Sequence, residues 1–545
     1  MKKKIVATII IVVIILSMFS MLPISFAATE DEIEQSIIDG IEWLAGMQNP
    51  DGSWGNGWVI AKTGLAVLKL IDYVKEVPDI DSWTDPNYVY QSNVSAGLDF
   101  LFREGYYVNI SVQTYGDPDT LNNDKGIRFT GFDDYETSVA LMALGATMTP
   151  SLTVTAPGPL NGVTYSDVVQ DIVDYLSYTQ RESTDARGGW GYEGDPTWAD
   201  NSVSGYAALG LGYAQAFGAT IPQFVKDELT HWIGIIQSPA GYSYYRPPAT
   251  GWPDPYGDHL LRTGNLLYEM ALVGMPVDHP NVTIALTYIE NNWALGGSSY
   301  QRAYCLMKGL EAYGIEDEIS VGVTGDWFNE TSTFIVITQN PDGSWPSDPH
   351  DGDYPYPLTA AWALLTLERA VAIPEKTPWG MKEDARELLV SHLGLYDKHI
   401  EHDIQQAIWH IDKSMNPDLW VDDSHLVWQH GNKVFDEEKL AVKELLHIVE
   451  WKNPPSDAVD MAFEVIEILV ESDEKLATIE YDEALPYAGT NKQVDHQLEL
   501  ALEEFANAAD ELATDKKGHP KYDDAINAYN KAWQHAGLAI QHALK

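Results

Sequence analysis

Ionisable residues gather at the starts of several strongly apolar segments of this 545-residue chain. Paired carboxylates can supply a general acid and a general base, and such a pair on either side of a sugar bond performs glycoside hydrolysis. Carboxylates at a helix start are also ordinary N-caps, so each of them has a structural interpretation as well. The candidate site residues are Asp134, Tyr135, Glu136, Asp200, Asp258, His259 and Arg302.

The elements that must position these residues come from an internal repeat. The heptamer QNPDGSW occurs at 48–54 and again at 339–345, and aligning the chain on it gives six imperfect units over 30–373. Each unit has an amphipathic segment, a loop rich in Gly, Asp and Trp, and a far more apolar segment such as SVSGYAALGLGYA. A helix that is apolar on all sides must be enclosed. Six such hairpins predict an all-α fold, an (α/α)6 toroid with the apolar helices inside.

The heptamer itself is best interpreted as architectural. Gln48 follows its helix, where carbonyl groups lack intrahelical partners and an amide donor is useful. Asp51 and Gly52 form a tight turn, and Trp54 covers the helix ends. The first and last units carry the best-preserved copies, so we expect them to meet where the toroid closes.

A toroid of this kind predicts where a ligand would bind. The apolar helices are rich in small residues, which leaves room on the axis, and their N-termini point the same way. Exposed N–H groups and helix dipoles then converge on one mouth, where polar ligand groups are best held. We expect the seven candidate residues at this mouth. Aromatic loops of the third and fourth units should cover it, with Tyr242, Tyr244, Tyr245, Trp252 and Tyr256.

The repeat resembles the QW motif of the terpenoid cyclase and protein prenyltransferase superfamily, which includes the squalene–hopene cyclases. Weaker copies are Gln180 followed by Gly189-Trp190-Gly191, and Gln237 followed by Gly241-Tyr242. The resemblance covers about residues 30–373 and implies the α/α toroid.

The catalytic motifs of that superfamily are not matched. Its cyclases protonate an alkene with the acid of a DxDD motif, and the nearest string here has Tyr135 at the proton donor's position. Its prenyltransferases bind zinc through an Asp-x-Cys pair and a His. Cys305 is present, but Ala303 stands at the Asp position and the last apolar helix has no His. The resemblance therefore implies no cofactor and no metal here, and Cys305 is interpreted as a small buried hydrophobe.

Two functions remain open. The favoured one is a non-catalytic toroid that binds an apolar, glycan or protein ligand. The alternative is a secreted enzyme on the same scaffold, either a degenerate terpenoid cyclase or a glycan hydrolase or lyase that uses paired carboxylates. Asp134 or Glu136 would then act with Asp200 or Asp258.

Composition and the N-terminus restrict the setting. A net charge of −48 disfavours nucleic acid and anionic lipid as partners. A single cysteine leaves stability to core burial. Residues 1–27 are interpreted as a signal peptide, with three lysines, an apolar run from Ile5 to about Phe19, and Ser25-Phe26-Ala27 at the cleavage site. We expect a secreted or cell-surface protein; an uncleaved segment would tether it to the membrane.

A second domain is predicted at 382–545, an acidic bundle of four or five amphipathic helices. Eleven of the 15 histidines follow residue 390, and His399 and His402 share a helix face. Scattered surface histidines are the favoured interpretation, and a metal or pH-responsive site is the alternative.

Overall fold

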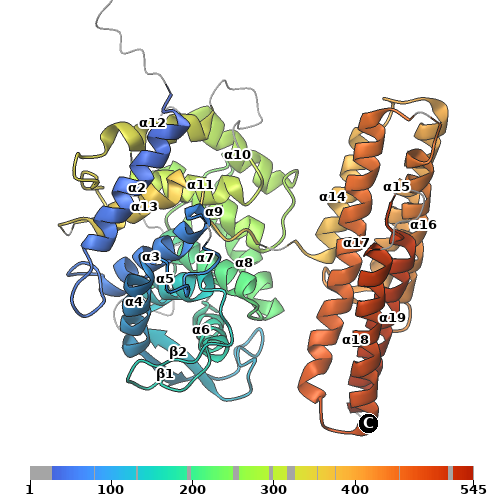
Figure 1. Cartoon of the computed structure of the whole chain (residues 1–545), viewed down its shortest axis with the longest axis horizontal. Helices are drawn as coiled ribbons and strands as arrows, with labels where there is room; N and C mark the ends of the chain where they lie inside the picture. The colour runs from blue at the N-terminus through green and yellow to red at the C-terminus, as the bar shows by residue number, and fades with distance from the viewer. Residues whose placement is uncertain are drawn as a thin grey trace, which may run out of the picture. The chain divides into compact units, whose positions relative to one another are not determined.

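The described part of the chain is mostly helical, with 63% of its residues in helix and 4% in strand, and this confirms the all-α class. It divides into two compact units, residues 1–375 and 376–545 (Figure 1). The structure is a computed structural model that describes residues 27–78, 80–129, 133–183, 185–192, 198–248, 257–293, 299–315, 326–352, 354–374, 376–452, 454–513 and 519–543. The predicted signal peptide therefore lies outside the described residues, apart from Ala27.

The first unit alternates two kinds of helix. The outer helices bury one face and expose the other. The inner helices are enclosed along nearly their whole length, as in α13, where every residue is buried. The outer helices are α2 (Glu30–Gly46), α4 (Gln91–Glu104), α6 (Tyr165–Thr179), α8 (Gln223–Ile236), α10 (Pro280–Asn292) and α12 (Trp327–Thr338). The inner helices are α3 (Val59–Asp72), α5 (Asp133–Ala146), α7 (Asn201–Phe217), α9 (His259–Leu272), α11 (Tyr300–Glu311) and α13 (Pro357–Leu367).

Each inner helix packs against the next one in the sequence, from α3 to α13, and α13 packs against α3. The outer helix α2 contacts both α12 and α13, so the last hairpin lies beside the first (Figure 1). Small residues allow the close approach that the repeats predict. A Cβ on Gly264 of α9 would lie 2.2 Å from the backbone oxygen of Cys305 in α11.

The heptamer loops join neighbouring repeats of the first unit. The Gln48 side-chain amide donates to the backbone oxygens of Gly52 in its own loop and Asn93 in α4, both at 2.9 Å. The Gln339 amide makes the corresponding bonds to Gly343 and to Ser36 of α2, at 3.1 and 2.9 Å. Within this unit the sixth repeat therefore contacts the first repeat in the way that the first repeat contacts the second.

One expected role within this loop moves to another residue. The Gln48 side-chain amide donates to Gly52 and Asn93 rather than to the carbonyls of its own helix, where only the Gln48 backbone N–H donates, to Ala45. The indole N–H of Trp54 takes that role and donates to the Leu44 oxygen at 2.8 Å. Trp345 repeats the bond with Ile335 at 2.9 Å.

A small antiparallel hairpin that the repeat pattern does not predict stands between α4 and α5. Strand β1 (Gly105–Asn109) pairs with β2 (Lys125–Phe129), with Gly105 opposite Phe129. The hairpin is an insertion into the second repeat, because it lies between the two helices of that repeat. Helix α6 packs on β2. The 3₁₀ turn η1 (Tyr73–Glu76) follows α3.

The second unit is a helical bundle with six described α-helices rather than the predicted four or five. The chain leaves the helical conformation near Gly394, which has φ +84°, so two helices stand on either side of it, and the longest helix of this unit spans Ser456–Ala484. The helices are α14 (Pro378–Ser391), α15 (Lys398–Ser414), α16 (Asn432–Val449), α17 (Ser456–Ala484), α18 (Lys492–Ala513) and α19 (Tyr522–Ala543), with η4 (Pro417–Leu419), η5 (Leu485–Tyr487) and a minimal hairpin of β3 (Trp420–Asp422) and β4 (His425–Leu426).

Within the described residues, no helix has both the length and the apolar character that crossing a bilayer requires.

Candidate ligand-binding cavity

A cavity of about 390 Å³ lies at the N-terminal ends of the inner helices. All six inner helices, or the residue just before them, contribute to its wall, because they begin at the same end of the unit. Its size falls within the range of small-molecule sites. The lining residues are Trp58, Lys62, Tyr135, Tyr192, Asn201, Ser202, Tyr245, Asp258, Leu261, Arg262, Gln301, His350, Asp351, Gly352, Leu358 and Trp362.

One wall of the cavity is aromatic. The Trp58 ring meets Tyr135 edge-on with centroids 5.6 Å apart, and Tyr192 lies 6.2 Å from Tyr135. Trp58 has φ +52°, a backbone conformation that a bulky side chain rarely adopts, and it remains 38% exposed. A strained, half-exposed tryptophan at a cavity rim is a candidate for ligand contact.

A buried ion pair also forms part of the lining. The Lys62 ammonium lies 3.8 Å from the Asp351 carboxylate, and the two side chains are 1% and 0% exposed. Asp351 also accepts a hydrogen bond from the Thr359 backbone N–H at 2.9 Å. The lysine charge is thus balanced, and Asp351 is fixed at the start of α13.

Asp258 is held just as firmly. The Arg302 guanidinium donates to both of its oxygens, with the shortest contact at 2.6 Å. Asp258 also caps α9 by accepting from the Leu261 N–H at 3.2 Å. Arg262 donates to the Asp258 backbone oxygen at 3.1 Å. The Asp258 carboxylate therefore caps α9 and pairs with Arg302.

His350 is a cavity residue that the sequence analysis missed. Its Nδ1 lies 3.0 Å from Asp348, and this hydrogen bond raises the pKa of the imidazole above its ordinary value. Burial alone would raise the Asp348 pKa, but hydrogen bonds from His350 and Ser299 outweigh it and hold that pKa low. Asp348 also accepts from the Tyr300 N–H at the start of α11. Its place in the sequence could have indicated this role, because His350 lies in the loop just before the last apolar helix.

The structure places two of the seven predicted residues, Tyr135 and Asp258, in the cavity lining. Arg302 does not line the cavity but pairs with Asp258. The other four serve neighbouring contacts. Asp134 is buried 3.6 Å from Arg181, and burial raises its pKa to about 6.

Glu136, Asp200 and His259 are engaged with the surrounding helices. Glu136 accepts from the backbone N–H of Ala61 in α3 at 3.2 Å. Asp200 is the N-cap of α7 and accepts from the Val203 N–H at 3.0 Å. The His259 ring stacks on an aromatic ring of the preceding loop at a centroid distance of 4.1 Å.

The expected aromatic cover is only partly described. Tyr245 lines the cavity, and Tyr242 instead packs against Tyr244 with ring centroids 5.2 Å apart. Trp252 and Tyr256 lie outside the described residues.

A buried polar layer lies among the same inner helices. The Trp362 indole of the cavity wall donates to the Tyr206 hydroxyl at 3.1 Å. The Lys308 ammonium lies 5.0 Å from the Tyr206 ring centroid, and burial lowers the pKa of this lysine. Burial also raises the pKa of Glu269 in α9 to about 8, against the opposing effect of the Lys308 charge.

Cys305 is fully buried on α11. Burial raises the pKa of its thiol to about 11, so the group stays protonated near neutral pH.

No protein-family model matches this sequence, and a comparison with curated proteins also gives no match.

Proposed function

We propose that the first unit is an (α/α)6 toroid of the terpenoid cyclase and prenyltransferase type, and that it binds a small neutral glycan in its mouth cavity without catalysis. The packing of each inner helix on the next, and of α13 on α3, supports the toroid. The four QW-like glutamines support the resemblance. The side-chain amides of Gln180 and Gln237 donate to their own loop and to the next repeat, as those of Gln48 and Gln339 do. The lysine-rich N-terminus and its apolar run support export to the cell surface.

The state of the cavity carboxylates carries the argument against catalysis. Among the described lining residues, the carboxylates are Asp258 and Asp351. Each is bound to a cation and to a backbone N–H at a helix start. A glycosidase needs one carboxyl group as a proton donor and a second as a base or nucleophile. Acids held in ion pairs suit recognition better than proton transfer.

The remaining lining selects the ligand class. Asn201, Ser202 and Gln301 offer amide and hydroxyl groups beside the rings of Trp58 and Tyr135. Asn201 and Ser202 are held in place by hydrogen bonds to Ser243 and Asp200. A sugar hydroxyl can share a hydrogen bond with such groups, whereas an apolar ligand would only remove them from water, which costs binding energy. A protein partner covers a much larger surface than the mouth of a cavity of about 390 Å³ offers. The chain's net charge of −48 also favours a neutral ligand over an anionic one.

Trp58→Ala should weaken binding of the preferred sugar by at least about fivefold, because truncating an aromatic contact residue costs more than about 1 kcal/mol. Titration calorimetry with a panel of neutral mono- and oligosaccharides measures this. Trp409→Ala is the matched control, since Trp409 is an exposed tryptophan of the second unit. Equal affinity of the two variants, or a panel without any binder, would refute the proposal.

The alternative is an enzyme, and one observation favours it. His350 is paired with Asp348 at the cavity, an arrangement that can provide a general base. If the protein cleaves a bound oligosaccharide, His350→Gln should abolish release of reducing ends while leaving affinity nearly unchanged. Binding without any release of reducing ends supports the non-catalytic function.

A further inference from the structure

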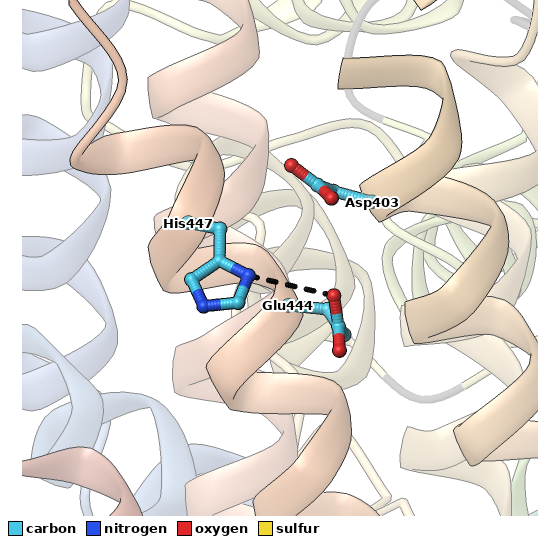
Figure 2. A group of neighbouring side chains, drawn as sticks. All are labelled: Asp403, Glu444 and His447. Atoms are coloured by element: carbon cyan, nitrogen blue, oxygen red, sulfur yellow. Dashed lines mark ion pairs between the residues drawn. The ribbon is translucent and has the colours of Figure 1, made fainter. Parts of the chain in front are cut away.

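Two helices of the second unit bring three potential metal ligands together. Asp403 extends from α15 toward Glu444 and His447 on α16 (Figure 2). One donor atom from each residue lies within 4.8 Å of the other two. Glu444 and His447 are three residues apart, which places them on one face of α16. Their spacing alone gives no hint of the third ligand, because Asp403 comes from another helix.

The cluster holds two carboxylates and one imidazole. Asp403 is only 9% exposed, so its carboxylate lies largely out of water. Two carboxylates held this close together repel one another unless a cation lies between them.

Neighbouring side chains support the ligands from outside. The Trp451 side chain hydrogen-bonds Asp403. The ring of His399 lies against Trp451, with centroids 5.1 Å apart. Outer partners of this kind fix the orientation of metal-binding carboxylates and are a regular part of metal sites.

The donor set indicates the class of ion. One imidazole nitrogen with two carboxylate oxygens suits zinc and the other divalent first-row transition metals. Calcium takes six to eight oxygen ligands, and magnesium usually keeps several waters and few protein groups. Three protein ligands also leave coordination positions for water, and the exposed His447 side keeps them open to solvent.

We propose that Asp403, Glu444 and His447 form a binding site for a divalent first-row transition-metal ion, with zinc as the best match, and that the ion links α15 to α16. The competing interpretation is a plain surface ion pair, since His447 Nδ1 lies 3.5 Å from Glu444 (Figure 2). That interpretation leaves two carboxylates, one of them buried, beside a single imidazole.

The test titrates Zn²⁺ into chelator-treated full-length protein. We expect one zinc equivalent to bind more tightly than any other, and Asp403→Asn, Glu444→Gln and His447→Ala each to weaken it by at least about tenfold. His430→Ala is the matched control, because His430 is an exposed histidine outside the cluster and should leave this equivalent unchanged. Ca²⁺ should compete poorly.

Two further readouts separate a real site from incidental histidine binding. Co²⁺ should give visible absorption bands of a low-symmetry site in the wild type, and the three variants should lose them. Zinc should raise the melting temperature of the wild type and not of the variants, whose metal-free melting curves report whether they fold. Zinc affinity that is unchanged in Asp403→Asn and His447→Ala would overturn the proposal, as would equal loss in His430→Ala.

Discussion

Glu269→Gln should make the protein markedly more stable than the wild type at about pH 9, with little difference between the two at about pH 5. Glu269 is fully buried, and burial raises its pKa from 4.5 to about 8. The folded chain therefore binds more protons at this site than the unfolded chain between these pH values, so the free energy of unfolding falls as pH rises through that window. Glutamine keeps the size and polarity but does not titrate.

The expected effect is large. The shift of the Glu269 pKa changes the free energy of unfolding by on the order of 5 kcal/mol across this pH window, since each pH unit contributes about 1.4 kcal/mol. Denaturant unfolding of both proteins at several pH values measures it. Glu34→Gln is the control, because Glu34 is exposed on α2 and should leave the pH profile unchanged.

One outcome would contradict this account. If Glu269 and Lys308 form a charged pair at high pH, Glu269→Gln would leave a buried ammonium without a counter-charge and destabilise the protein there. Lower stability of the variant at about pH 9 would therefore show that the pair, rather than the lone acid, governs this part of the core.

Gly343→Ala should destabilise the first unit by about 2–4 kcal/mol. Gly343 has φ +86°, and a Cβ at this position would lie 2.3 Å from the Asp39 backbone oxygen of α2. The left-handed backbone costs alanine about 1 kcal/mol, and forcing atoms into a packed contact adds about 1–3 kcal/mol. The clash falls where the sixth repeat meets the first.

Gly274→Ala separates these two contributions. Gly274 has φ +79° in the same unit, but a Cβ there would meet nothing within 4 Å. Gly274→Ala should therefore lower the free energy of unfolding only by the cost of the left-handed backbone, about 1 kcal/mol. Thermal and denaturant unfolding measure both variants, and equal losses would show that the loop simply moves away from α2.

Repetition made the helices of the first unit predictable from the sequence. Periodic apolar residues, such as Ile41 and Leu44, mark the buried face of an outer helix. Tyr135 and Asp258 could be placed near the cavity because they stand at the starts of inner helices. The β1–β2 hairpin could not, since it is an insertion that no other unit repeats.

The remaining site residues depend on contacts that spacing does not encode. Asp200 and Asp258 have the same position in their repeats and both cap a helix, yet Asp258 lines the cavity and pairs with Arg302 while Asp200 does not line it. His350 and Asp351 stand in a loop, where no periodicity exists to read. Asp403 meets Glu444 only through the packing of α15 on α16.

The contact of Gln339 and Gly343 with α2 also bears on how the first unit loses its structure. A linear array of repeats has two end units, each supported on one side only, and it frays from those ends. Here the first and last repeats support one another through Gln339 and Ser36, so neither is a loose end. Releasing any single hairpin breaks two junctions instead of one. Partial unfolding should therefore be rare, and native-state amide exchange should report one cooperative opening shared by all six repeats rather than a gradient along the chain.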